Sequence, residues 1–149
     1  MRTIPRELTI SREDIGWIAG IIDGESSICY GRLNGGRCKV YWGLYMVNTN
    51  EKMIEKFVRI IQAISKTDDK MYIAEKKYSK SIVSKKKCWQ VTVRKKKVLL
   101  PLLKAIRDHL TEKQLRADAL IEFLEKHKTN QRHSEEDIAR LVETKRLAL

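Results

Sequence analysis

The chain has 149 residues, enough for one domain with its own hydrophobic core. Lysine and arginine total 31 against 19 acidic residues, and the net charge of +12 favours a polyanionic partner, with nucleic acid first and an acidic membrane as the competitor. No apolar run is long enough to span a bilayer and no signal-peptide pattern opens the chain. We therefore expect a protein that is not secreted, cytoplasmic in a prokaryotic host or organellar if organelle-encoded.

The cysteines and histidines show no metal-binding or disulfide pattern. The three cysteines form no C-x-x-C pair, which is typical of reduced thiols: Cys29, Cys38 and Cys88. The three histidines lie apart and pair with no cysteine: His109, His127 and His133. The sequence therefore predicts no His/Cys metal site.

The first predicted helix begins after Ser11, because a serine with an acid three residues on resembles a capping box. Isoleucines at helical spacing extend it over residues 12–24. A strand over 28–33, a turn at 34–36 and a strand over 39–47 follow. In the second strand the side chains alternate between an apolar face, Val40, Trp42, Leu44 and Met46, and a face carrying Lys39, Tyr41, Gly43 and Tyr45. This alternation predicts a sheet with one buried and one open face.

The second half of the chain repeats the pattern of helix and two strands. The segment Asn48-Thr49-Asn50 supplies cap residues for a helix over 53–61, and strands are predicted over 71–77 and 87–94. Three helical segments close the chain: 98–106 with Pro101 near its first turn, one opened by the capping-box pattern at 111–114, and one capped by Ser134. We predict a single α+β domain over residues 1–149 with the element order α-β-β-α-β-β-α-α.

Basic residues concentrate between Lys70 and Lys97, where Glu75 is the only acid. A solvated loop would explain the lysines at 85–87 alone. On the strand beside them, however, Gln90, Thr92 and Arg94 alternate with apolar residues and would share the open face. Such side chains supply donors and acceptors for bases and phosphates.

We therefore predict that the open face binds double-stranded DNA. The first strand does not divide cleanly into two faces, and a bulge would switch them. The expected DNA-binding residues are Arg32, Asn34, Arg37, Lys39, Tyr41, Tyr45, Tyr72, Lys76, Lys80, Lys85, Lys86, Gln90, Thr92 and Arg94.

A stripe of small residues runs along the first helix. Gly16, Gly20 and Gly24 recur every four residues, with Ala19 beside them, although glycine lowers helix stability. The stripe would admit another helix backbone, and the natural partner is the same helix of a second subunit across a two-fold axis. The alternative is a close contact within one chain. We expect this helix, with Asp23 at its end, to form the interface of a homodimer.

Glu25 follows that stripe directly. On a two-fold axis each Glu25 would meet its symmetry mate, and two close carboxylates favour a bridging divalent cation. Beneath a basic sheet of DNA size, the expected chemistry is metal-assisted phosphodiester hydrolysis. For a lone acid after a helix, the alternative is simple solvation or turn capping.

Residues 17–25, WIAGIIDGE, resemble the LAGLIDADG motif of homing endonucleases. The resemblance spans the chain, because the order of the later elements matches as well. It implies the αββαββα(α) fold, with a four-stranded antiparallel DNA-binding saddle backed by helices. One motif copy implies the homodimeric branch. The implied activity is sequence-specific double-strand cleavage at a long pseudo-palindromic site, leaving short 3′ overhangs, by an enzyme that is typically intron-encoded.

The resemblance also implies roles for single residues. Glu25 would bind the metal together with the backbone carbonyl of Gly24. Asn48, or Thr49 if the register slips by one, would orient water, and Lys52 is the implied basic residue on the following helix. Lys113 would lie near the scissile phosphate. The implied cofactor is Mg²⁺, with Mn²⁺ or Ca²⁺ able to replace it for binding, and no nucleotide cofactor is expected.

Ser26 departs from the motif, in which glycine is common at this position. The sequence therefore does not define the backbone geometry with which the chain leaves the helix. Two other functions share the basic face: an RNA-binding intron maturase, and a DNA-binding regulator that has lost cleavage. Retention of Glu25, Asn48 and Lys113 favours the nuclease, because a maturase needs no metal ligand.

Overall fold

The computed structural model of the protein describes residues 10–33, 39–66, 71–75, 87–127 and 133–147. Its elements are α1 (Arg12–Glu25), β1 (Ser26–Arg32), β2 (Val40–Asn48), α2 (Glu51–Ser65), β3 (Tyr72–Glu75), β4 (Trp89–Val93), α3 (Lys96–Ile106), the short 3-10 helix η1 (Arg107–His109), α4 (Gln114–Lys126) and α5 (Glu135–Leu147). The predicted α+β class is confirmed. The three helical segments predicted after the last strand are present as α3, α4 and α5, although the predicted order α-β-β-α-β-β-α-α contained only two of them.

Helix starts follow the predicted caps in three cases. Ser11 Oγ accepts a hydrogen bond from the Asp14 amide at 3.1 Å, Asn50 caps α2, and Ser134 caps α5. The capping-box prediction at 111–114 is wrong, because the N-cap of α4 is Lys113 and the carboxylate of a distant residue receives the amides there. α3 begins two residues earlier than predicted, so Pro101 lies inside the helix.

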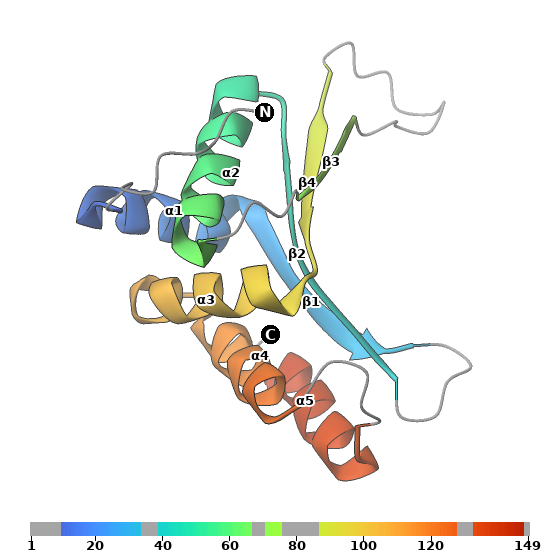
Figure 1. Ribbon diagram of the computed structural model, residues 1–149. Helices are drawn as coiled ribbons and strands as arrows, with labels where there is room; N and C mark the ends of the chain where they lie inside the picture. Colours follow the sequence, from blue (N-terminus) through green and yellow to red (C-terminus); the bar gives the residue numbers. More distant parts are fainter. Residues whose placement is uncertain (1–9, 34–38, 67–70, 76–86, 128–132, 148–149) are drawn as a thin grey trace.

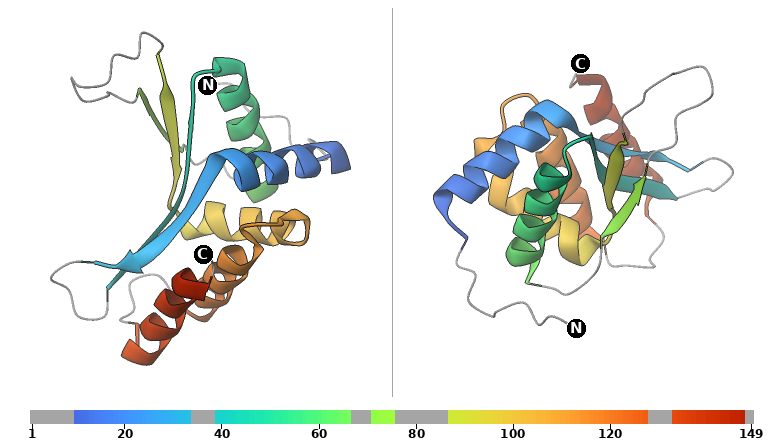
Figure 2. Two further views of the ribbon diagram at one scale, coloured as in Figure 1. Left: turned by 180° about the vertical axis from the view of Figure 1, so that it is seen from behind. Right: turned by 90° about the horizontal axis from the view of Figure 1, so that it is seen from above.

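The sheet is antiparallel, with strand order β1-β2-β4-β3. All five α-helices lie on one side of it, and no described helix covers the other face (Figure 1; Figure 2). Val40, Leu44, Met46, Val91 and Val93 point to the helices and are buried, as the alternation predicted. The apolar residues thus form a single core between sheet and helices.

Each covering helix contributes an apolar side to this core. In α2 the buried residues Ile54, Phe57 and Ile61 recur at helical spacing. Tyr30 of β1 is fully buried, and its hydroxyl forms a hydrogen bond with Thr144, which ties α5 to the sheet. None of the described helices is both long and apolar enough to cross a membrane.

Candidate functional site

The acidic end of α1 lies on the molecular surface. Glu25 is the last residue of the helix, and both Glu25 and Gly24 are exposed. The chain enters β1 directly at Ser26, which is buried and whose Oγ has no hydrogen-bond partner among the described residues. The candidate metal ligand therefore sits where α1 meets the sheet.

Asp23 and Lys113 join this end of α1 to the start of α4. The Asp23 carboxylate accepts hydrogen bonds from the amides of Thr111 at 2.9 Å, Glu112 at 3.1 Å and Lys113 at 3.0 Å. Lys113 Nζ donates to the Ile22 carbonyl at 2.9 Å and also to the Asp23 carbonyl. Burial raises the pKa of Asp23, but the three amides and Lys113 outweigh it, and the pKa lies below its usual 3.8. Asp23, predicted at a dimer interface, thus uses its carboxylate within the chain.

Lys113 is therefore close to Glu25 in the fold, although 88 residues separate them in sequence. The register brings Asn48 to the same region, because Met46 pairs with Ser26, the residue after Glu25. Asn48 Oδ1 accepts the Asn50 amide at 2.7 Å, and strand alternation sets Asn48 on the side of the helices. The alternative, Thr49, is exposed.

The donors at this end suit a hard cation. Gly24 offers a carbonyl in the last turn of α1, where carbonyls lack intrahelical partners, and Glu25 offers an exposed carboxylate. Oxygen donors of this kind fit Mg²⁺ better than softer metals. Within the described ranges, no group of three or more His, Cys, Asp or Glu could hold a metal ion.

The glycine stripe of α1 faces outward. Gly16, Gly20 and Gly24 are exposed, and a β-carbon added at any of them would meet no described atom within 4 Å. The predicted alternative of a close contact within the chain is therefore wrong for its described part. Ala19 was predicted to join the stripe, but it is 1% exposed and packs into the core.

Tyrosines lie flat on the open face of the sheet. A β-carbon at Gly31 would stand 2.8 Å from the Tyr41 hydroxyl, and one at Gly43 would stand 3.0 Å from the Tyr45 ring. A larger residue at either position would therefore displace the neighbouring tyrosine ring. Both tyrosines were predicted on this face, and the structure places them there.

Arg94 and Gln90 make a connected polar surface beside Tyr45. Arg94 Nε donates to the Tyr45 hydroxyl at 3.2 Å, and the guanidinium carbon lies 5.6 Å from the ring centroid. Gln90 Nε2 donates to Thr92 Oγ1 at 3.3 Å. Thr92 is only 8% exposed, so the prediction that it is exposed is wrong: it lies on an inner strand, with the Gln90 amide against its hydroxyl.

The side chains of β1 divide cleanly between the two faces of the sheet, contrary to the prediction. Its register with β2 is continuous from Ser26 to Arg32, without a bulge. Cys29 and Gly31 share the open face, whereas Arg32 lies on the helix side and pairs with Glu135 at 2.6 Å. The structure therefore removes Arg32 from the predicted DNA-facing set. Lys39 precedes β2 and is exposed.

Several predicted contact residues lie outside the described residues: Asn34, Arg37, Lys76, Lys80, Lys85 and Lys86. Tyr72 belongs to β3, and by register it pairs with Thr92. Lys52 is exposed in the first turn of α2.

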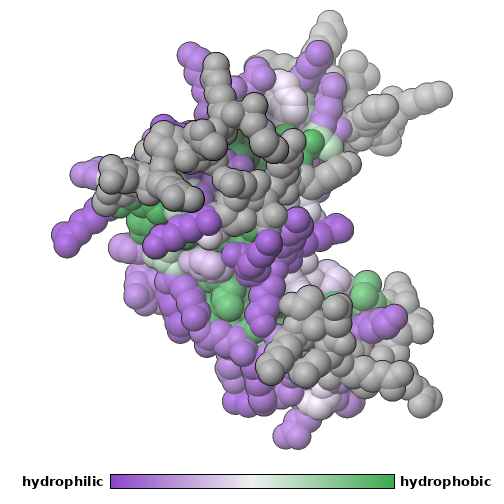
Figure 3. Space-filling view, viewed as in Figure 1, coloured by the Kyte–Doolittle hydropathy of each residue, from purple (hydrophilic) through white to green (hydrophobic). Residues whose placement is uncertain are grey.

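A basic groove adjoins the open face where β4 turns into α3. Its polar side is formed by four consecutive basic residues, Arg94 to Lys97, and its apolar side by Trp42, Leu100 and Pro101. Figure 3 shows mostly hydrophilic residues on this side of the molecule, with small apolar areas between them. The sequence placed these lysines in the basic run but gave them no contact role. Their position became evident only from the fold, because Trp42 lies 52 residues before Arg94, whose carbonyl accepts its indole N–H.

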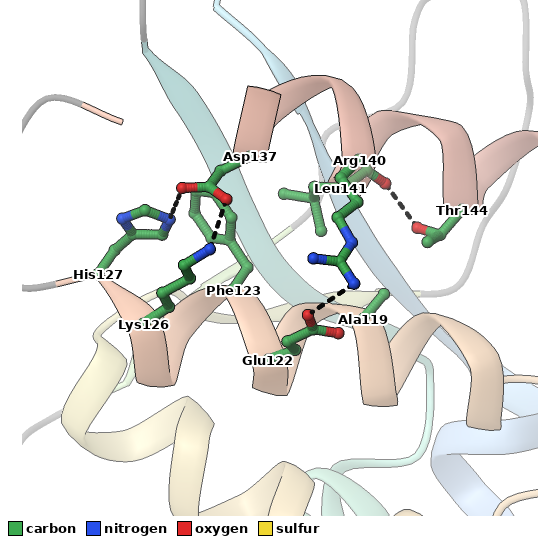
Figure 4. Close-up of a pocket in the computed structure, with 9 residues that line it drawn as sticks. All are labelled: Ala119, Glu122, Phe123, Lys126, His127, Asp137, Arg140, Leu141 and Thr144. Atoms are coloured by element: carbon green, nitrogen blue, oxygen red, sulfur yellow. Dashed lines mark hydrogen bonds and ion pairs between the residues drawn. The ribbon is translucent and has the colours of Figure 1, made fainter. Parts of the chain in front are cut away.

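A second pocket lies between α4 and α5 (Figure 4). Its charged side chains pair across the two helices: Lys126 with Asp137 at 2.8 Å, and Arg140 with Glu122 at 3.5 Å. Phe123 lies among them. This pocket joins the helices, and it is lined by the second half of α4, away from the α1 end.

His133 is a buried histidine that packs against His127 of this pocket. It is 9% exposed, and its ring lies 4.6 Å from that of His127 and 6.2 Å from that of Trp42. Burial, and next the neighbouring His127, lower the pKa of His133 from 6.5, against the opposing effect of Asp137. Well above pH 6.5 the residue is neutral in both the folded and unfolded states. As the pH falls to 6.5 and below, the unfolded chain binds a proton at His133 more readily than the folded protein does.

We therefore expect the free energy of unfolding to fall as the pH drops from about 7 to about 5, and His133→Phe to reduce that fall. Thermal unfolding followed by circular dichroism across this range measures the slope. His109→Phe, at an exposed position, is the control and should leave the slope unchanged. Equal slopes for wild type and His133→Phe would contradict the assignment.

Comparisons with known proteins show which solved structures share this fold. No family model matches the chain, and no curated protein matches it. Among solved structures, it is similar to the archaeal intron-encoded homing endonuclease I-Vdi141I complexed with DNA, with a TM-score of 0.67 and 14% identity over 91% of this chain and 82% of that one.

Two further structures agree. The homing endonuclease I-CvuI, in complex with a DNA target and Ca²⁺, gives a TM-score of 0.60 at 16% identity, over 93% of this chain and 81% of that one. The LAGLIDADG homing endonuclease I-GzeII, in complex with its DNA target, gives 0.56 at 14% identity, over 86% and 40%. The chain thus has the homing-endonuclease fold that the motif implied.

Proposed function

We propose that this chain is a sequence-specific, metal-dependent double-strand DNA endonuclease. The observation that supports the proposal is that Lys113 Nζ contacts the last turn of α1, the helix that ends at the exposed Glu25. The homing-endonuclease fold and the net charge of +12 support DNA as the substrate. The test is a cleavage selection on a randomised duplex library with Mg²⁺. Recovery of one long cut site supports the proposal, and binding without cleavage would favour the regulator.

The active species is proposed to be a homodimer joined through α1. The exposed stripe Gly16, Gly20 and Gly24 supports this, because it offers a flat surface to a second helix. A two-fold dimer reads two half-sites, so we propose a long pseudo-palindromic target cut to short 3′ overhangs. Intron encoding is proposed on the likeness to I-Vdi141I.

Residues at the α1 end carry the proposed chemistry. Glu25 and the carbonyl of Gly24 would hold Mg²⁺, which when bound polarises the phosphoryl group and lowers the pKa of water. The ammonium of Lys113 stabilises negative charge near the scissile phosphate. Asn48, or Thr49, would orient water, and Lys52 adds positive charge at the start of α2.

We propose that polar side chains on the open face of the sheet read the DNA bases. Gln90 can pair with adenine, and Arg94, already oriented by Tyr45, can pair with guanine in the major groove. We predict that Gln90→Ala and Arg94→Ala each relax discrimination at defined base pairs by ~1–3 kcal/mol.

The matched control for these variants is Lys39→Ala, at an exposed position before β2. It should weaken binding to all sequences alike and flatten the salt dependence by up to ~0.9 in slope, as expected for a phosphate contact. Binding of each variant to singly substituted sites at several salt concentrations measures both effects. A uniform loss for Gln90→Ala would show that it grips phosphate.

A further inference from the structure

α4 begins without a cap from its own segment. Its N-cap residue Lys113 makes no side-chain capping bond, although the first amides of a helix need acceptors. Asp23, from the last turn of α1, binds the backbone just before the helix instead: its two carboxylate oxygens accept the amides of Thr111, Glu112 and the N-cap residue Lys113 at 2.9–3.1 Å. One side chain of α1 therefore holds the turn that leads into α4.

The reverse contact comes from Lys113. The last turn of α1 contains no basic residue, while its carbonyls carry the negative end of the helix dipole. Lys113 Nζ donates to the carbonyls of Ile22 and Asp23 at this end. Two of the three N–H donors of the ammonium are thus engaged, and the charge stands two residues before Glu25.

We propose that Asp23 is a positioning residue: by holding the backbone of residues 111–113 against the end of α1, it keeps the Lys113 ammonium beside Glu25. The inference rests on the proposed function in taking Glu25 and Lys113 as the cleavage site. A carboxylate suits this task because its two charged oxygens accept three amides at once. With those oxygens occupied by amides, Asp23 acts through Lys113.

The first test separates binding from cleavage. Asp23→Ala should lower the single-turnover cleavage rate of bound DNA by about 10- to 100-fold, the loss typical of residues that orient a functional group, without changing the dissociation constant for the same site. Ser134→Ala is the matched control, because it removes the cap of α5 and should leave cleavage unchanged. In a Lys113→Met background, Asp23→Ala should cause no further loss. Additive losses would overturn the proposal.

The second test does not depend on cleavage. Acylation of the Lys113 amine by a small activated ester, followed by mass spectrometry, should be several-fold faster in Asp23→Ala than in wild type and unchanged in Ser134→Ala. If Asp23→Ala does not fold, Asp23→Asn, which keeps one acceptor oxygen, should show a smaller change in the same direction. Unchanged labelling in a folded Asp23 variant would overturn the proposal. A wild-type chain that cuts no DNA would refute the proposed function, and labelling would still decide whether Asp23 positions Lys113.

Discussion

Glu25→Gln is expected to abolish cleavage while leaving specific DNA binding largely intact. The substitution keeps the shape of the side chain but removes the negative charge that would hold Mg²⁺ at the end of α1. Glu25 is exposed, so the change leaves no buried polar group without a partner and should not lower the free energy of unfolding. We expect the cleavage rate to fall by more than about 100-fold, beyond the loss typical of residues that only support a metal ligand.

The measurement is single-turnover cleavage of bound DNA over a range of Mg²⁺ concentrations. Glu13→Gln is the control, since Glu13 is an exposed acid in the first turn of the same helix. Full activity of Glu25→Gln with Mg²⁺ would remove Glu25 from the mechanism.

Substitutions at Gly20 distinguish a dimer interface from a solvent-exposed helix face, because they should destabilise the protein in the first case and stabilise it in the second. In the isolated chain nothing described lies within 4 Å of a β-carbon there. Gly20→Ala would then gain up to about 1 kcal/mol from helix propensity. Across a tight two-fold contact, added atoms would instead meet the partner backbone. We expect Gly20→Leu to dissociate the dimer and abolish cleavage of the full site.

Sedimentation velocity of wild type and variant at the same concentration measures the effect. Glu55→Leu, which adds an exposed leucine on α2, controls for surface hydrophobicity. A wild-type chain that is monomeric and active at that concentration would rule out the dimer.

Local patterns predicted most of the fold because alternation and caps act over a few residues. Val40 to Met46 predicted the buried face of β2, and Ser11, Asn50 and Ser134 predicted helix starts. The errors came from contacts between distant segments. The backbone that leads into α4 is held by Asp23, from another helix, and no pattern around Thr111 reveals it.

The predictions of site residues also depended on whether the information was local or came from distant segments. Glu25 and Gly24 could be named because the motif is contiguous, and Lys113 because the resemblance implied it. Arg32 was predicted on the wrong face because the sequence of β1 alone does not determine which of its residues point to the helices. Its pairing with β2 does determine this, and it sets Arg32 on the helix side. Thr92 has the parity of an exposed residue, yet its neighbours on the sheet cover it.

The contact between Asp23 and the start of α4 also orders the events of folding. It joins segments 88 to 90 residues apart, with the whole sheet between them, so its closure carries a high entropic cost until β1 to β4 have formed. A nascent chain that ends before residue 111 has the acidic end of α1 but no lysine to place beside it. The two halves of the proposed site thus meet only in a chain that has been synthesised past α4 and folded, and incomplete translation products are expected to be inert toward DNA.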